Sequence, residues 1–105
     1  MLDDETVNEI VRRILQVTDV QRVILFGSAA SGTMNADSDI DLLVVKSNVT
    51  NPIKESVRID AAMSGLGYPF DIFVISKTSF EKTKDIVGSL AWPANHGGRV
   101  LYDAA

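Results

Sequence analysis

The sequence predicts a protein of the α/β class, because short apolar segments of strand length alternate with longer segments of helical periodicity. Three segments fit buried strands, at residues 23–26, 39–45 and 70–75. The length of 105 residues matches one domain, and no repeat, proline-rich linker or block of charge divides the chain. We therefore expect residues 1–105 to form a single domain.

Two helices are predicted from periodicity and from the residues at their ends. Apolar residues recur at helical spacing from Val7 to Leu15, and the acidic residues before them favour the positive end of the helix dipole. Asn51 and Pro52 are typical of the first positions of a helix, and apolar residues then recur every four positions until Gly65. Both helices are expected to cover the sheet.

The remaining segments are shorter. Residues 29–37 are small and polar, which predicts a short helix followed by a loop. Residues 78–81 fit a capping box that opens another helix, and Ser89 is the candidate cap of a last helix, in which Pro93 restricts the first hydrogen bonds. Residues 100–102 are expected to pack onto the body as a terminal segment. The directions of the three strands do not follow from this pattern.

Charge and composition exclude several classes of function. The formal net charge of −4 argues against non-specific binding of long nucleic acid, which needs clustered lysine and arginine. No apolar run approaches the roughly 18–20 residues of a membrane span, and the acidic start differs from a signal peptide. The sequence therefore predicts a cytoplasmic protein with no membrane partner. Because the chain has no cysteine, carboxylates are its main chemical resource.

Asp39 and Asp41 open the second predicted strand and form the first candidate site. Since side chains alternate along a strand, both carboxylates are expected on one face and Ile40 on the other. Two unpaired carboxylates beside an apolar sheet would repel each other and lose hydration. A divalent cation is therefore a natural occupant, with waters and substrate phosphates completing its shell. The alternative is a solvated loop that carries two ordinary surface acids.

Three further residues are candidates for the same site. Asp71 interrupts an apolar run at residues 70–75, where a carboxylate is unusual. It is a third metal ligand, the base for an acceptor's proton, or simply an acid that reaches water at the strand end. Gly27 and Ser28 follow a strand and precede a short helix, where backbone amides and a hydroxyl favour phosphate. The alternative is a tight turn that needs glycine for its geometry alone.

Together these residues resemble a known family. The segment 23–28, then Gly32, then the segment 37–45 with its Asp-x-Asp pattern is similar to the signature of the minimal nucleotidyltransferases of the DNA polymerase beta superfamily. Asp71 falls where that family has a third aspartate on a later strand. The resemblance implies a small mixed β-sheet flanked by helices, like the palm of polymerase beta.

The resemblance also implies the chemistry of the site. In this family Gly27 and Ser28 would hold the triphosphate, and Asp39, Asp41 and Asp71 would bind Mg²⁺, with two ions expected. A hydroxyl of a partner protein or a small molecule then attacks the α-phosphorus of ATP or a similar nucleotide. Pyrophosphate leaves, and the nucleoside monophosphate remains on the acceptor.

A partner follows from the same resemblance. The chain has no residues left for a second domain, so the acceptor pocket is expected from a partner protein or from a second copy in a homo-oligomer. Relatives of this kind are commonly paired, as antitoxins, with a helical HEPN-type toxin that receives AMP. Ser31, however, stands where the family often has an arginine that could clamp phosphate. The second hypothesis is therefore a catalytically silent antitoxin that neutralises its partner by binding.

Overall fold

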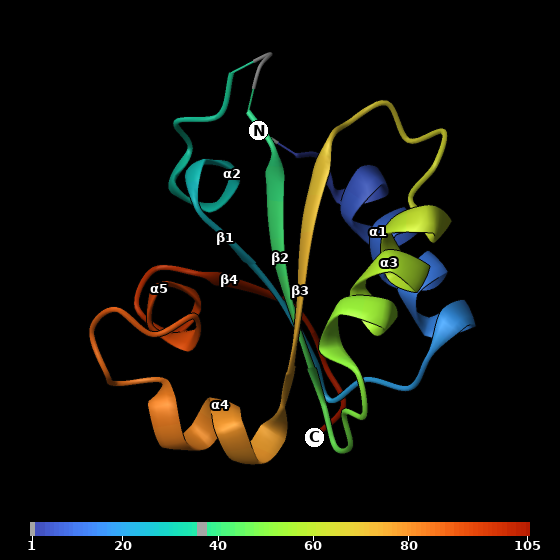
Figure 1. The fold of residues 1–105 in the computed structure, drawn as a ribbon. Coiled ribbons are helices and arrows are strands. Elements are labelled where there is room, and N and C mark those ends of the chain that lie inside the picture. The colour runs from blue at the N-terminus through green and yellow to red at the C-terminus, as the bar shows by residue number, and fades with distance from the viewer. Residues whose placement is uncertain (1, 36–37) are drawn as a thin grey trace.

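The computed structural model describes residues 2–35 and 38–105, which form a four-stranded sheet with helices on both faces (Figure 1). The predicted loop through Ala36 and Asp37 lies partly outside the described residues, as does Met1. The strands are β1 (Arg22–Phe26), β2 (Ile40–Lys46), β3 (Phe70–Ser76) and β4 (Arg99–Asp103). The helices are α1 (Asp4–Val17), α2 (Ser28–Ser31), α3 (Pro52–Ala62), α4 (Lys77–Thr83) and α5 (Ala91–Asn95).

The sheet is mixed and has the order β3-β2-β1-β4. β1 runs antiparallel to both of its neighbours, β2 and β4, whereas β2 and β3 are parallel. The parallel pair needs a crossover connection, which α3 provides between β2 and β3. The predicted α/β class and the small mixed sheet flanked by helices are therefore confirmed.

The ends of the longer helices follow the predicted local chemistry. The side chain of Asp3 accepts a hydrogen bond from the backbone N–H of Thr6 at 2.8 Å and so caps α1. Asn51 caps α3 in the same way by accepting from the backbone N–H of Lys54 at 3.1 Å, directly before Pro52. These contacts satisfy backbone donors that have no partner within the helix.

Two predictions about the second half of the chain were wrong in detail. The segment 100–102 is part of a fourth strand, because pairing with the outer side of β1 satisfies its backbone hydrogen-bonding groups. α4 begins at Lys77, directly after β3, and its cap is Ser76 rather than the predicted 78–81 box. Ser89 does accept a hydrogen bond from the backbone N–H of Trp92, in the first turn of α5.

The sheet separates two clusters of buried apolar side chains. Figure 1 shows the sheet from the side of its edge strand β3. Helices α1 and α3 lie on one face of the sheet, and α4 and α5 lie on the other. The first cluster joins β2 to α1 and α3 through residues such as Ile10, Leu42 and Ile59. The second includes Leu43 and Phe80 and packs against α4 and α5. Among the described residues, no helix has the length and apolar character needed to cross a membrane.

Candidate functional site

The predicted acids lie at one end of the sheet, where β2 and β3 begin. Because β2 and β3 are parallel and in register, Asp41 is the direct neighbour of Asp71 across the two strands. Asp39 comes immediately before β2, which starts at Ile40 and not at Asp39 as predicted. On its other side Asp41 pairs with Phe26, the last residue of β1. The register therefore brings to one place residues that are 30 positions apart in the sequence.

The side of the sheet on which Asp41 lies follows from strand alternation. Ile40 and Leu42 are buried in the cluster beneath α1 and α3, whereas Leu43 belongs to the cluster beneath α4 and α5. Asp41 shares the side of Leu43, and Asp71 shares the side of Phe73 by the same period of two. The expected separation of Asp41 from Ile40 is thus confirmed.

Burial and neighbouring charge both act on Asp41. This side chain is half-buried, and its burial raises the pKa of the carboxyl above the ordinary value of 3.8. The negative charges of Asp71 and Asp39 raise that pKa further. Asp39 and Asp71 are exposed. A cation placed among the three carboxylates would relieve both the repulsion and the loss of hydration.

Gly27 leaves the space that the Asp41 carboxylate occupies. Its backbone angles are φ 73° and ψ −152°, a region open in practice only to glycine. A Cβ atom at this position would overlap Asp41 Oδ2 and lie 3.3 Å from Asp41 Cγ. The glycine is therefore required by its backbone conformation and also by the close approach of a carboxylate, so the tight-turn reading alone does not account for it.

Ser28 begins α2 next to this glycine, and Ser31 ends the helix. The backbone N–H groups of Ala30 and Ser31 both donate to the carbonyl of Gly27, at 3.2 and 3.1 Å. The Ser31 hydroxyl donates to the carbonyl of Ser28 at 3.3 Å and lies 2.9 Å from Thr33 Oγ1. Ser31 thus uses its hydroxyl in contacts with Ser28 and Thr33.

The donor set fits magnesium better than a metal that needs a complete protein cage. Among the described residues, no three Asp, Glu or His side chains are already arranged as a group that could hold a metal ion. Mg²⁺ does not require such a group, because it is usually bound through one or two carboxylates and keeps waters and substrate phosphates. The adjacent carboxylates of Asp41 and Asp71 suit this mode of binding.

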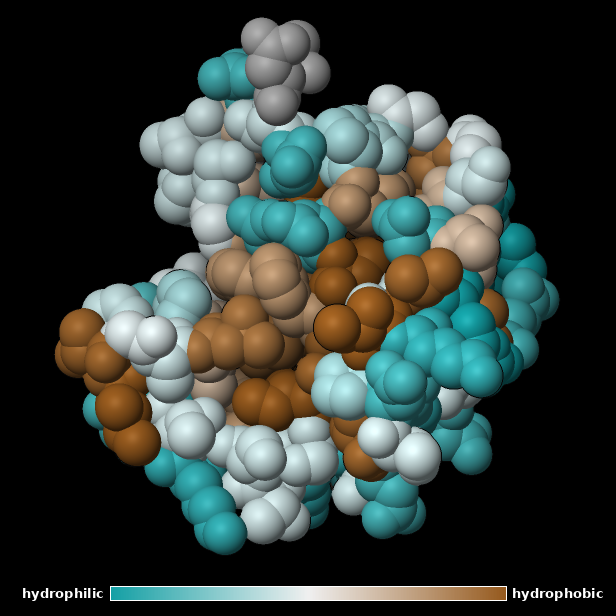
Figure 2. Space-filling model, viewed as in Figure 1, coloured by the Kyte–Doolittle hydropathy of each residue, from teal (hydrophilic) through white to brown (hydrophobic). Residues whose placement is uncertain are grey.

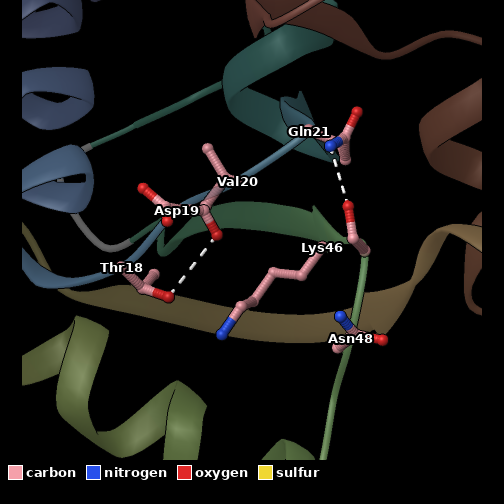
Figure 3. A pocket seen from close by; sticks show the side chains of 7 residues that line it. Thr18, Asp19, Val20, Gln21, Lys46 and Asn48 are labelled. Atoms are coloured by element: carbon pink, nitrogen blue, oxygen red, sulfur yellow. Dashed lines mark hydrogen bonds between the residues drawn. The ribbon is translucent and has the colours of Figure 1, made fainter.

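A hollow lies at the opposite end of the sheet and is separate from the acids. It has a volume of about 420 Å³ and is lined by Thr18, Asp19, Val20, Gln21, Lys46, Ser47 and Asn48 (Figure 3). Gln21 Nε2 donates to Ser47 Oγ at 2.8 Å across one side of it. Lys46 is paired with Glu55, so its charge is already neutralised. This hollow contains none of the predicted site residues.

Two phenylalanines lie beside the acids. Phe73 forms a tilted pair with Phe26, with ring centroids 5.9 Å apart; Phe26 is the cross-strand partner of Asp41, and Phe73 follows Asp71 by two residues on the same side of the sheet. Both phenylalanines read as ordinary strand residues, and only the register of β1, β2 and β3 reveals their position. They give the acid pair an apolar flank.

Comparison with known proteins identifies the family of the chain and related folds. The model of the nucleotidyltransferase domain family matches residues 5–92. A toxin–antitoxin with AMP-PNP has a TM-score of 0.69 and 20% identity, covering 92% of this chain and 73% of that chain. A mutant of the toxin–antitoxin MntA–HpeT has a TM-score of 0.65 and 18% identity, with coverages of 92% and 72%.

A third solved structure is a tri-AMPylated Shewanella oneidensis HEPN toxin in complex with MNT antitoxin. It has a TM-score of 0.61 and 18% identity, covering 97% of this chain and 73% of that chain. No curated protein matches the sequence. At these identities the likeness to solved structures shows a shared fold, while the family model extends over most of the chain. The chain therefore belongs to the nucleotidyltransferase domain family and is related in fold to the MNT antitoxins of HEPN toxin–antitoxin pairs.

Proposed function

We propose that this chain is a magnesium-dependent nucleotidyltransferase that transfers AMP from ATP to a hydroxyl group of a partner protein, as the antitoxin of a toxin–antitoxin pair. The observation that carries the proposal is the pairing of Asp41 with Asp71 on parallel strands. The Asp41 carboxylate occupies the space that a side chain at position 27 would fill. Like-charged carboxylates held side by side at a strand end are costly unless a cation joins them.

The chain's own groups would act mainly by positioning. Asp39, Asp41 and Asp71 would hold the metal, and Gly27 and Ser28 would contact the triphosphate. When bound, magnesium supplies positive charge that stabilises the phosphate oxygens during transfer. The acceptor oxygen forms a bond to the α-phosphorus while the bond from that phosphorus to the pyrophosphate oxygen breaks. The hydroxyl proton passes to a carboxylate of the site or to water, and pyrophosphate leaves.

A protein acceptor is supported by the partner proteins that are present in structures of related folds. A related fold was solved as a toxin–antitoxin with AMP-PNP, and another as an MNT antitoxin with a tri-AMPylated HEPN toxin. We infer a HEPN-type helical protein as the partner of this chain. A small molecule with a free hydroxyl is the other acceptor class that the same chemistry accommodates.

A second candidate function is neutralisation of the partner by contact alone. Ser31 favours it, because its hydroxyl is engaged by Ser28 and Thr33 and offers no cation to a phosphate. An arginine at this position could form a bidentate, charge-assisted contact worth about 1.5–3 kcal/mol. If that contact forms in the transition state, Ser31→Arg is expected to accelerate transfer by roughly tenfold to a hundredfold.

The two candidates differ in one experiment with the purified chain, a co-expressed HEPN-type partner, Mg²⁺ and ATP labelled at the α-phosphate. If the chain is an enzyme, the wild type should transfer label to the partner, and Asp71→Ala should transfer none. Thermal melts should show that Mg²⁺ with ATP stabilises the wild-type chain, since a ligand of the folded state raises its melting temperature. If the wild-type chain and Asp71→Ala inhibit the partner equally without label transfer, the contact-only antitoxin replaces the enzyme.

A further inference from the structure

The outer edge of β3 is open and lacks the usual protection of an edge strand. β3 is the first strand in the sheet order, and no strand in the described part of the chain pairs with its outer side. Natural edge strands are commonly protected by lysine, proline, bulges or short length. β3 has seven residues without lysine or proline, and its single charged residue is Asp71 at the start. Such an edge can accept a further strand from another chain.

A groove follows this edge between β3 and α3. It consists of two adjoining hollows of about 210 and 180 Å³, which share Ser56 and Ile72 in their walls. One hollow is bounded by Asp60 and Asp71, and the other ends at Leu90. The groove therefore runs along β3 from one of the proposed metal-binding acids to the segment before α5.

The two ends of the groove differ in chemistry. Ile53 and Leu90, which are 77% and 37% exposed, border one hollow, and Val57, which is 61% exposed, borders the hollow that also contains Asp60. Figure 2 shows apolar residues gathered over β3 and the adjoining flank of α3, with hydrophilic residues around them. Exposed apolar patches with a polar rim commonly mark interaction sites. At the other end, the carboxylate of Asp60 favours a cationic or hydrogen-bond-donating group, whereas Asp71, at the edge of the same hollow, turns its side chain to the side of Phe73 on the opposite face of β3.

We propose that this groove receives an extended segment of the partner protein, which pairs with the open edge of β3 and presents its acceptor hydroxyl at Asp71. This inference rests on the proposed function. Seven residues of strand span about 23 Å, so one short segment can reach from Leu90 to Asp71. Its apolar side chains would cover Ile53 and Val57, while a basic residue beside the hydroxyl would neutralise Asp60.

A second copy of this chain fits the groove less well than such a segment. Two copies paired edge to edge would each contribute β3, whose only charged residue is Asp71. The paired strand would offer no cation to Asp60 of the other copy. It would also cover the open edge of β3 beside Asp71. Charge complementarity therefore favours a basic, apolar segment with a hydroxyl.

The test uses synthetic nine-residue peptides with alternating valines, one tyrosine and one arginine beside it. Backbone amide signals of the ¹⁵N-labelled chain report binding, and those of β3 and α3 are expected to shift. Ile53→Glu and Val57→Glu should each weaken binding at least fivefold. The controls are Val87→Glu and Ile86→Glu, at apolar positions 78% and 55% exposed outside the groove, which should change binding less than twofold. Replacing the peptide's arginine by glutamate should weaken binding at least fivefold.

The outcomes separate the groove from the proposed function. The proposal that a segment binds in the groove would be overturned if the amide signals of β3 did not shift. It would also be overturned if the groove variants and the control variants lost equal affinity for the peptide. Sedimentation showing a wild-type dimer that Ile53→Glu dissociates would overturn it in favour of a second copy. With Mg²⁺ and labelled ATP, label on the tyrosine peptide and none on its phenylalanine counterpart would support both inferences. Binding along β3 without label transfer would retain the groove and overturn the proposed transfer.

Discussion

Replacement of Gly27 by alanine tests the link between the turn after β1 and the position of Asp41. The backbone of Gly27 lies in a region that costs other residues about 1–3 kcal/mol. The new Cβ atom would also overlap Asp41 Oδ2. That oxygen is the end of a side chain that can rotate, so we expect the carboxylate to turn away rather than the turn to unfold.

Gly27→Ala is therefore expected to lower the free energy of unfolding by about 1–3 kcal/mol. With a urea dependence of about 1–3 kcal/mol per molar, a loss of 2 kcal/mol moves the midpoint by roughly 1 M. Gly32→Ala is the matched stability control, because Gly32 also has positive φ, at 80°, but has no atom within 4 Å of its Cβ position. Its cost should be about 1 kcal/mol, from the left-handed backbone alone.

The assay combines urea unfolding with calorimetric titration of Mg²⁺ and ATP. Gly27→Ala should lose binding even under conditions where it is fully folded, because Asp41 no longer faces Asp71. In an Asp41→Ala background, the cost of Gly27→Ala should fall by at least 0.5 kcal/mol, since the overlap is gone. If Gly27→Ala cost no more than Gly32→Ala and bound Mg²⁺ with ATP like the wild type, the proposed coupling would be refuted.

Three further predictions concern charge and packing. Because burial and the neighbouring carboxylates raise the pKa of Asp41, the contribution of this group to stability is present below pH 3.8 and is lost as pH rises through the raised value. Asp41→Asn should then be the more stable protein at pH 7 without metal and lose that advantage below pH 3.8; equal differences at both pH values in urea melts would contradict this. The hydrogen bond from Lys46 lowers the pKa of Glu55 below 4.5, so its contribution is present above 4.5 and is lost as pH falls through the lowered value. Glu55→Gln should accordingly destabilise at pH 7 and less at pH 3, and a pH-independent effect in thermal melts would argue against the ion pair. Gly98→Ala would place a Cβ atom against the carbonyl oxygen of Ala94, which moves only with α5. It should lower the free energy of unfolding in urea by about 1–3 kcal/mol. A loss below about 0.5 kcal/mol would show that α5 shifts easily to make room.

The sequence by itself determined the features that depend on neighbouring residues. Alternation along β2 separates Asp41 from Ile40 whatever the rest of the chain does, because successive side chains of a strand point to opposite faces. Asn51 and Pro52 likewise start α3 through contacts within one helical turn. The match of the family model over residues 5–92 agrees with the resemblance seen in the local motifs.

Only the tertiary structure decided how these pieces meet. The direction and register of β3 place Asp71 beside Asp41, and the connection between the strands is compatible with more than one pairing. β4 is a strand because the free side of β1 accepts it, whereas its sequence predicted only a terminal segment packed onto the body. The close approach of Asp41 to Gly27 and the groove along β3 bring together residues that are far apart in the chain. Such contacts depend on the packing of whole elements, which local propensity does not encode.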